Sequence, residues 1–493
     1  VAPFKSQNMA LNSYITLGGG EIGRATAFQA EAAGIEPETD MNPVLLKATG
    51  ESGCQVILNG RVYDTMKAHE YYAIKKMVWQ EITAAYDRLS EKYDLIIIEG
   101  AGSPAEINLR NEEVVNMKVA RYADAAVILV GDIDRGGVFA QFYGTVELLK
   151  DPIDGFSDSD KTDSDYIKAF IINKFRGDME ILRPGLRMIE DKTNIPVIGT
   201  LYWQGNIGLD EEDGLSIEEF KKADPSECFE PLKVVVLRLK YIANFTDFAP
   251  FMYEKDIEFK YSMREEDIIN ADLIIIPGSK NTVADLMLLR QSGMEQCIKK
   301  TVAKGTPLIG ICGGYQMLGQ KILDPENVES NFQEIEGMGL LDTITTMDSK
   351  KTTCRVTAKV TGPMWFKAVP GGCGCRWNQL KGYEIHMGQT TGDLGLFEIE
   401  RSSGSLADGS AKGNVWGTYL HGIFDNDGLR TDMLNSLRKQ KGLVERSTVN
   451  YKAIRESSID HWAKILGESV DICFMLRQVG MESCMNRFQE ELA

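Results

Sequence analysis

The stretch Leu308-Ile309-Gly310-Ile311-Cys312-Gly313-Gly314-Tyr315-Gln316-Met317-Leu318-Gly319 decides the fold of the second half of the chain. The apolar run 307–311 predicts a buried parallel strand, and a helix is expected to start near Tyr315. Gly313 and Gly314 permit the sharp turn that a strand-to-helix elbow needs. Such an elbow exposes the Cys312 sulfur at a helix N-terminus, where the partial positive charge lowers the pKa of a thiol. A buried cysteine at a strand end is usually only a small hydrophobic residue, but the glycine pair favours a reactive thiol.

The size and composition of the chain limit the classes of protein to consider. A length of 493 residues implies two or three domains. The net charge of −18 argues against nonspecific nucleic-acid binding, which needs a basic surface. The nine cysteines are scattered through the chain, and we find no signal peptide and no apolar stretch of membrane-spanning length. These features predict a cytoplasmic protein with reduced thiols and no membrane partner.

The first part of the chain alternates strand-like and helical patterns up to about residue 223. Continuous apolar runs of this kind predict an α/β fold, in which helices cover both faces of a mostly parallel sheet. Functional groups in such sheets gather at the carboxyl ends of the strands, which is where Glu99, Asp132 and Asn173 fall. The apolar runs are 93–99, 125–130, 169–172 and 197–201.

A second alternating pattern begins at 233–239, after a polar stretch, 210–231, in which we place the domain boundary. It continues through the strand-like run 273–277 to the Cys312 elbow, and the later runs 352–362, 396–401 and 415–420 also predict strands. The remainder, roughly 430–437 and 451–476, is helical. We therefore expect two domains, each with a mostly parallel sheet, and a C-terminal helical tail that packs on the second domain. The expected ranges are 1–225, 233–440 and, for the tail, 441–493.

A cysteine nucleophile needs a base, and His421 is the best placed of the four histidines because it ends the short apolar strand 415–420. A thiolate–imidazole pair would attack a carboxamide or ester carbonyl and form a thioester. The backbone N–H groups of Gly278, which follows another strand, and of Gly313 could stabilise the tetrahedral oxyanion. His69 and His461 lie in helical patterns and are assigned to packing or the surface.

Three separated motifs resemble class I glutamine amidotransferases, which hydrolyse glutamine at the cysteine and release ammonia. They are 277–279 (PGS), 310–316 (GICGGYQ) and 418–422 (TYLHG). Many members carry an acid two residues after the histidine, but here Ile423 occupies that position. The resemblance is therefore to the cysteine–histidine branch that contains the cobyric-acid-type enzymes. Asp425 and Glu384 are candidates for the group that orients His421, and neither is favoured.

The motif 382–388 (GYEIHMG) belongs to the same branch. It is interpreted either as a loop lining the glutamine site or the passage between domains, or as a structural loop whose His386 is hydrogen-bonded locally. The sequence does not separate the two. Cys373 and Cys375 could suggest a metal site, but a single Cys-x-Cys without a second pair favours a flexible loop.

Motifs in the first half extend the resemblance to the cobyric acid synthase family over nearly the whole chain. That half is similar to dethiobiotin synthetase and other P-loop ligases. The resemblance implies a P-loop-NTPase-like first domain and a flavodoxin-like second domain. It also implies ATP-dependent amidation of the b, d, e and g carboxylates of a corrinoid, adenosylcobyrinic acid a,c-diamide, to give adenosylcobyric acid, with L-glutamine supplying the ammonia. The motifs are 3–13, 99–106, 132–139, 173–178 and 244–247.

The same resemblance suggests roles for the acids and the lysine of the first half. Glu99 is a hard oxygen ligand for the Mg²⁺ that bridges the phosphates of ATP. Lys5 would neutralise a phosphate or a substrate carboxylate, and the amide of Asn173 suits an adenine edge. Asp132 and Asp134 would meet the substrate or the transferring phosphate. The alternative role for these acids is helix capping. A functional role is favoured over capping for Glu99, and the two roles are equally plausible for Asp134.

The chain departs from the ligase pattern in one respect, because no Gly-x-x-x-x-Gly-Lys-[Ser/Thr] phosphate loop occurs in it. The segment 18–23 is glycine-rich but lacks the lysine, and its place matches a turn after the family's phosphate loop. We expect that the start of the fold is missing and that the chain without it binds ATP poorly, while the glutaminase site is complete. The alternatives are the sibling cobyrinic acid a,c-diamide synthase and a non-catalytic glutaminase-like binding protein. The motifs 7–13 and 134–137 favour the cobyric acid enzyme.

Overall fold

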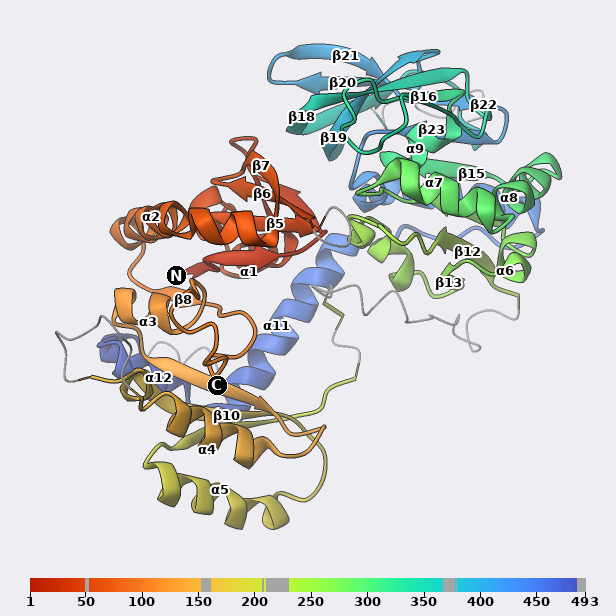
Figure 1. Cartoon of the computed structure of the whole chain (residues 1–493). Coiled ribbons are helices and arrows are strands. Elements are labelled where there is room, and N and C mark those ends of the chain that lie inside the picture. The colour runs from red at the N-terminus through yellow and green to blue at the C-terminus, as the bar shows by residue number, and fades with distance from the viewer. Residues whose placement is uncertain are drawn as a thin grey trace. The chain divides into compact units, whose positions relative to one another are not determined.

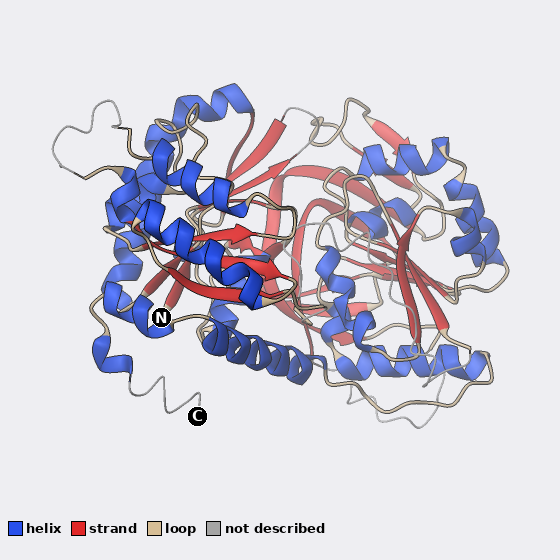
Figure 2. Ribbon diagram, turned by 90° about the horizontal axis from the view of Figure 1, so that it is seen from below, coloured by secondary structure: helices blue, strands red, loops and turns tan. Residues whose placement is uncertain are grey.

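The computed structural model describes residues 1–48, 53–151, 161–205, 208–209, 230–366, 377 and 379–485. The chain forms two compact units, each with parallel strands and covering helices, which confirms the predicted α/β class (Figures 1 and 2). The first unit contains Val1–Gln7, Tyr72–Leu209 and Ala453–Ala493, and the second contains Asn8–Tyr71 and Asp210–Lys452. Most of the predicted linker, 210–231, and both Cys373 and Cys375 lie outside the described residues.

The first unit is built on parallel strand pairs whose carboxyl ends hold the predicted polar residues. Strand β1 pairs with β8, and β9, β10 and β11 form a parallel sheet in the order β11-β10-β9. The strands are β1 (Ala2–Phe4), β8 (Ile96–Ile98), β9 (Val127–Asp132), β10 (Ile167–Phe175) and β11 (Val197–Tyr202). The helices are α2 (Ala68–Lys92), α3 (Met117–Ala123), α4 (Val138–Leu148) and α5 (Met179–Thr193).

Strand β10 alternates between two covered faces, as a strand with a period of two residues requires. Phe170 and Ile172 belong to an apolar cluster with residues of α4 and α5, which lie side by side in Figure 1. Ile171, between them, points to the opposite face and packs with Leu201 and Val470. Both faces of β10 are therefore covered, while Val130 on the neighbouring strand β9 remains exposed.

The C-terminal helices cover that second face, and this differs from the prediction that the tail packs on the second domain. Helix α11 (Tyr451–Ser469) leads to Val470, which forms a β-bridge with Gly199, and to α12 (Ile472–Gln478). The Asp471 N–H donates to the Ile198 carbonyl at 2.8 Å. The reason is the hydrophobic effect, because apolar residues of the tail cover an apolar sheet face that would otherwise meet water. The tail residues in contact are Ile465, Leu466, Val470, Ile472 and Met475.

The second unit contains a six-stranded sheet in the order β13-β12-β14-β15-β23-β22, parallel except for the edge strand β22. Its central strands are fully buried. Figure 1 shows α7 and α9 beside β15. The strands are β12 (Leu232–Leu237), β13 (Ile257–Ser262), β14 (Leu273–Ile276), β15 (Leu308–Ile311), β22 (Ser410–Lys412) and β23 (Val415–Thr418). The helices are α6 (Glu265–Ile269), α7 (Thr282–Gln291), α8 (Met294–Ala303), α9 (Gly313–Leu318) and α10 (Asp427–Gln440).

A largely antiparallel sheet packs in the same unit. The predicted strands 352–362 and 396–401 largely coincide with its strands β18 and β20, but their antiparallel pairing was not predicted. Its longest pair is β18 with β19, so the motif 382–388 is part of a strand and not of a loop. The strands are β16 (Lys321–Leu323), β17 (Glu334–Glu336), β18 (Thr343–Val360), β19 (Leu380–Gly392), β20 (Phe397–Arg401) and β21 (Gly404–Asp408).

The segment 8–71 belongs to the second unit, although the sequence placed it in a first domain, 1–225. The Arg355 side chain donates to the Ile15 carbonyl at 2.8 Å, and Ile15 packs with Tyr383 and Ile385. The glycine-rich run 18–20 is the turn of the hairpin β3–β4 and not a phosphate loop. The elements are β2 (Gln7–Met9), β3 (Ser13–Ile15), β4 (Glu21–Gly23), α1 (Arg24–Ala32), β5 (Val44–Ala48), β6 (Gly53–Leu58) and β7 (Arg61–Lys67).

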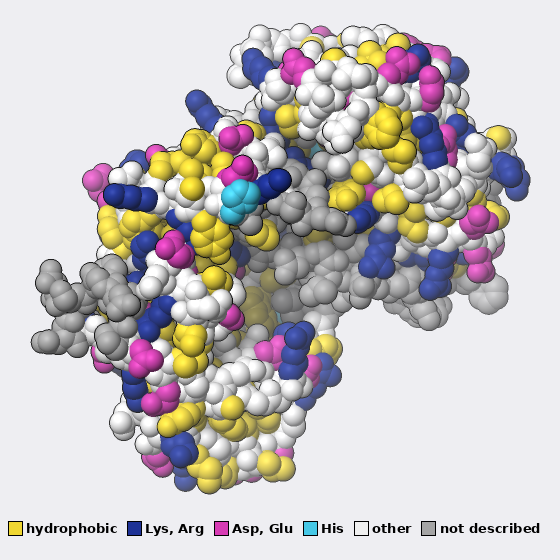
Figure 3. All heavy atoms as spheres, in the orientation of Figure 1, with side chains coloured by type: hydrophobic (Ala, Val, Ile, Leu, Met, Phe, Trp, Pro, Cys, Tyr) yellow, Lys and Arg dark blue, Asp and Glu magenta, His cyan; other side chains and the backbone are white. Residues whose placement is uncertain are grey.

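The surface of the protein carries charges of both signs. Figure 3 shows acidic and basic side chains interspersed over the visible face. Among the described residues, no helix combines the length and the apolar character needed to cross a membrane.

Candidate active site

The predicted elbow is present at Cys312, between β15 and α9. Cys312 has φ 51° and ψ −107°, a conformation that a residue with a side chain rarely adopts and that costs about 1–3 kcal/mol. The turn is tight, since a Cβ on Gly314 would lie 2.0 Å from the Ile276 carbonyl oxygen. The glycine at this position is therefore required by the close approach of β14. The Cys312 thiol lies 3.5 Å from the Ile385 carbonyl oxygen, to which it can donate.

His421 follows strand β23 and is 1% exposed. Its Nδ1 lies 2.6 Å from Asp247 Oδ2. The other Asp247 oxygen accepts from the Tyr383 hydroxyl and from the Gly422 N–H, both at 3.2 Å. His421 Nε2 is buried and has no hydrogen-bond partner among the described residues, so it is available to a substrate or to the cysteine sulfur.

The electrostatics of His421 favour its protonated form. Burial alone would lower the pKa of His421, but the carboxylate of Asp247 and the Cys312 sulfur outweigh it and raise the pKa to about 10. The imidazole is therefore cationic at neutral pH, and a cation beside the sulfur stabilises a thiolate. The arrangement can supply a nucleophile and a proton donor in the same cavity.

Asp247 is the acid that the sequence analysis did not identify. It lies in the 3-10 helix Phe245–Tyr253 and is buried. Asp425 and Glu384, the two acids considered from the sequence, are not the described partners of His421, whose Nδ1 lies 2.6 Å from Asp247. Glu384 instead accepts two hydrogen bonds from Arg401, each at 2.6 Å.

His386 lines the cavity next to Cys312 and is also hydrogen-bonded locally, so the structure combines both interpretations of its motif. Its Nδ1 lies 2.7 Å from the Gly388 carbonyl oxygen, and its ring stacks on Tyr419 with centroids 3.8 Å apart. Tyr419 in turn accepts from the Gln316 amide at 3.1 Å. The contacts of His386 fix one wall of the cavity.

Gly278 and Gly313, the predicted oxyanion donors, lie beside the sulfur and the imidazole. A Cβ on Gly278 would lie 3.2 Å from His421 Cε1 and 3.8 Å from Cys312 Cβ. A Cβ on Gly313 would lie 2.8 Å from the Ser279 nitrogen. Gly278 therefore lets the backbone approach the two functional side chains closely, and Gly313 lets the start of α9 approach Ser279.

Gly278→Ala is expected to lower glutamine hydrolysis about 10- to 100-fold while leaving the fold intact, because the added methyl displaces His421 or the substrate by a few tenths of an ångström or more. Ammonia release from glutamine measures the effect, and thermal unfolding checks the fold. Gly428→Ala is the matched control, since nothing lies within 4 Å of its Cβ position. Wild-type activity in Gly278→Ala would show that Gly278 does not border the reacting atoms.

The polar residues predicted in the first unit form two local groups. Lys5 and Glu99 follow the parallel pair β1–β8 and make an ion pair at 3.1 Å. Asp132 and Asn173 are paired residues of β9 and β10, so they share one edge of that sheet. Asp134 pairs with Arg176 at 3.2 Å. Among the described residues, no cluster of three or more His, Cys, Asp or Glu side chains could hold a metal ion alone.

Lys174 stabilises the ionised form of Asp132. Lys174 Nζ lies 2.9 Å from the Asp132 carboxylate, and this hydrogen bond lowers the pKa of Asp132. The side-chain oxygen of Asn173 accepts from the Lys174 N–H at 2.8 Å, which leaves the amide nitrogen of Asn173 as a donor. The edge of this sheet therefore offers both an anion and an amide to a ligand.

Comparisons with known proteins cover both halves of the chain. Residues 233–429 match the family of CobB/CobQ-like glutamine amidotransferase domains, and residues 19–208 match a family of AAA domains. The cobyric acid synthase of Thermodesulfovibrio yellowstonii is 47% identical over 478 residues, which is 96% of this chain and 92% of that protein. Those of Clostridium tetani and Clostridium acetobutylicum are each 44% identical, over 98% of this chain and 93% of their own length.

Proposed function

The chain belongs to the cobyric acid synthase family, and from this premise we propose that it is a glutamine-hydrolysing amidoligase whose ammonia comes from a Cys312–His421–Asp247 site. The observation that supports the glutaminase assignment most directly is that the Cys312 sulfur and the His421 imidazole border one cavity, while the Asp247 carboxylate binds the Nδ1 side of that imidazole. The reaction of this site is the hydrolysis of the side-chain amide of glutamine.

The chemistry of the glutaminase step follows from the geometry. The Cys312 thiolate attacks the carboxamide carbon, and the N–H groups of Gly278 and Gly313 bind the oxygen that becomes negative. The His421 imidazolium donates its Nε2 proton to the departing nitrogen, so that ammonia leaves and a thioester remains. Neutral His421 then takes a proton from water, which attacks the thioester and releases glutamate. Asp247 holds the Nδ1 proton of His421 throughout.

We further propose that the first half of the chain activates the carboxylates that the ammonia attacks. ATP would phosphorylate a carboxylate to an acyl phosphate, because a free carboxylate is a poor electrophile. When bound, Mg²⁺ would neutralise the phosphate oxygens, and Glu99 fits it as a hard ligand, since magnesium in such sites takes one or two carboxylates and keeps several waters. Lys5 would bind a phosphate or a substrate carboxylate, Asn173 the adenine edge, and Asp132 and Asp134 the substrate or the transferred phosphate.

The proposed substrate is adenosylcobyrinic acid a,c-diamide, amidated at its b, d, e and g carboxylates to adenosylcobyric acid. The names of the relatives at 43–47% identity support this choice over cobyrinic acid a,c-diamide synthase. The test is to supply the complete protein with the corrinoid, MgATP and glutamine labelled with ¹⁵N in its side chain. Label recovered in the corrinoid amides supports the proposal, and unchanged corrinoid contradicts it.

Glu99→Gln in the complete protein is expected to lower amidation at least about 100-fold with either glutamine or ammonium as the nitrogen source, because the lost charge weakens phosphate activation for both. The measurement is corrinoid amide formed, by mass spectrometry. Glu91→Gln, on the exposed side of α2, is the control. Normal synthesis from ammonium in Glu99→Gln would remove Glu99 from the activating site.

A further inference from the structure

Several charged side chains of the second unit line the cavity that contains Cys312. Lys47, Lys280, Lys351 and Glu329 line this cavity, and Glu21 lines an adjoining one. Lys47 comes from the segment 8–71, and the others that line the Cys312 cavity come from the second half of the chain. The proposed glutaminase chemistry uses none of them.

Two of the lysines share one carboxylate. Glu21 pairs with Lys47 at 3.0 Å and with Lys351 at 2.5 Å. Burial alone would raise the pKa of Glu21, but the two lysines outweigh it and lower the pKa. This trio has its charges largely satisfied, and it ties the segment 8–71 to strand β18.

Lys280 and Glu329 differ, because neither has a counter-charge within ion-pairing distance among the described residues. The Lys280 ammonium donates to the neutral side-chain oxygen of Gln55 at 3.1 Å. The Glu329 carboxylate accepts from the Thr282 N–H at 2.8 Å. Burial lowers the pKa of Lys280 and raises that of Glu329, and the attraction between their opposite charges offsets these shifts only in part. A ligand that brings an anion to Lys280 and a cation to Glu329 would return both groups to their charged forms.

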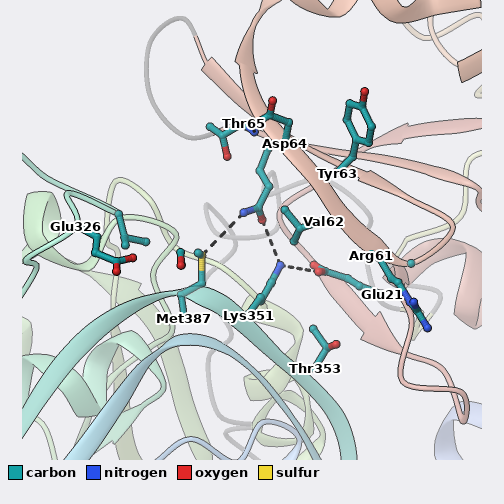
Figure 4. Close-up of a pocket in the computed structure, with 14 residues that line it drawn as sticks. Glu21, Arg61, Val62, Tyr63, Asp64, Thr65, Glu326, Lys351, Thr353 and Met387 are labelled. Carbon is teal, nitrogen blue, oxygen red and sulfur yellow. Dashed lines mark hydrogen bonds and ion pairs between the residues drawn. The ribbon is translucent and has the colours of Figure 1, made fainter. Parts of the chain in front are cut away.

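The sizes of the two cavities indicate how a ligand would lie. The cavity that Cys312, Lys280 and Glu329 line has a volume of about 50 Å³, which by itself is too small for a whole amino acid. It adjoins a cavity of about 600 Å³, and Lys351 and Met387 line both. Figure 4 shows Lys351 and Met387 among the residues that line the larger cavity. The Lys351 ammonium donates to the Gln55 side-chain oxygen at 3.2 Å, and the Gln55 amide nitrogen lies 3.9 Å from the Met387 sulfur. A molecule with its carboxamide at the sulfur would therefore extend its other end toward Lys280, Glu329 and the larger cavity.

An α-amino acid has a carboxylate and an ammonium on one carbon. These two charges would supply the counter-charges that Lys280 and Glu329 lack within ion-pairing distance among the described residues. We propose that Lys280 and Glu329 are a receptor for the amino-acid end of glutamine, in which Lys280 binds the α-carboxylate and Glu329 binds the α-ammonium. This inference rests on the proposed glutaminase function of the same cavity. It makes the two residues determinants of substrate specificity, separate from the groups that react.

The test compares three amides as substrates of the full chain, with ammonia release as the readout. They are L-glutamine, glutaramate, which lacks the ammonium, and γ-aminobutyramide, which lacks the carboxylate. The wild type is expected to have a kcat/KM for L-glutamine about 10- to 100-fold higher than for each analogue, because each analogue loses one charge-assisted hydrogen bond, which contributes a factor of about this size. Glu329→Gln is expected to lose the preference over glutaramate, and Lys280→Met the preference over γ-aminobutyramide. In both variants KM for L-glutamine should rise while kcat changes little.

The controls are nearby charges outside the receptor. Glu326→Gln, at the exposed margin of the larger cavity, and Lys350→Met, beside Lys351 on β18, are expected to keep the wild-type preferences. Glu329→Asp keeps the negative charge and should retain most of the preference over glutaramate. The proposal would be overturned if Glu329→Gln lowered the activity with L-glutamine and with glutaramate by the same factor, or if it lowered neither activity.

A binding measurement separates this inference from the glutaminase assignment. Calorimetry can measure the Kd of L-glutamine for the Cys312→Ala variant, which cannot hydrolyse it. The double variants that combine Cys312→Ala with Glu329→Gln or with Lys280→Met should each have a Kd about 10- to 100-fold higher than the single variant. If the wild type released no ammonia, the glutaminase assignment would fail, but calorimetry would still decide whether the receptor exists. Unchanged affinity in both double variants would refute the receptor even in an active enzyme.

Discussion

Cys312→Ala is expected to reduce glutamine hydrolysis at least about 10³-fold and to abolish glutamine-dependent amidation, because no other group can form the thioester. Amidation from added ammonium salt should be retained, since the acyl phosphate is attacked by ammonia whatever its source. The measurements are glutamate formed from glutamine and corrinoid amide formed from each nitrogen source, on the same preparation.

Cys297→Ala is the matched control for the cysteine. Cys297 lies in α8 and is buried, and burial raises the pKa of its thiol, so it is a structural cysteine. Its variant should keep wild-type hydrolysis. Substantial glutaminase activity in Cys312→Ala would show that the nucleophile is elsewhere. Loss of ammonium-dependent synthesis as well would show that the variant damages more than the glutamine site.

Asp247→Asn is expected to lower glutamine hydrolysis about 10²- to 10⁴-fold, as the corresponding change does in other triads. The asparagine can no longer stabilise the imidazolium, and it favours the wrong tautomer of His421. The pKa of His421 should fall from about 10, so the imidazolium form, present below that pKa, should be lost at a lower pH than in the wild type. NMR titration of His421 and the pH profile of Cys312 alkylation by iodoacetamide both follow this change.

The control for Asp247 is Asp425, the acid close to His421 in sequence. Asp425→Asn should leave the His421 titration and the hydrolysis rate unchanged, because the described acid at His421 Nδ1 is Asp247. The reverse result, with a normal Asp247→Asn enzyme and an inactive Asp425→Asn enzyme, would reassign the third residue of the site.

The elbow could be predicted because its causes are local. An apolar strand, a cysteine and two glycines follow one another in the chain, and their spacing alone requires the turn around Cys312. The placement of His421 followed from the same rule, since both residues end parallel strands. The parallel sheets of both units were predicted from continuous apolar runs for similar reasons.

Asp247 could not be predicted in this way, because its contact joins residues 174 positions apart and its 3-10 helix has no distinctive periodicity. One signal was present, since Ile423 occupies the usual position of the acid and so required another source for it. The positions of segment 8–71 and of the C-terminal helices were missed because short apolar patches show what must be buried but not which partner buries it.

The order in which the two units use the chain has a consequence for synthesis on the ribosome. The chain passes between them four times, after Gln7, Tyr71, Leu209 and Lys452. The sheet face that Ile171 helps to form is complete only when the segment around Val470 arrives. During translation this apolar face remains exposed until the segment around Val470 has been synthesised, which is more than half of the protein later. Exposed apolar surfaces of this kind promote aggregation. Chaperone dependence should therefore be a property of the first unit, although most of its residues emerge early.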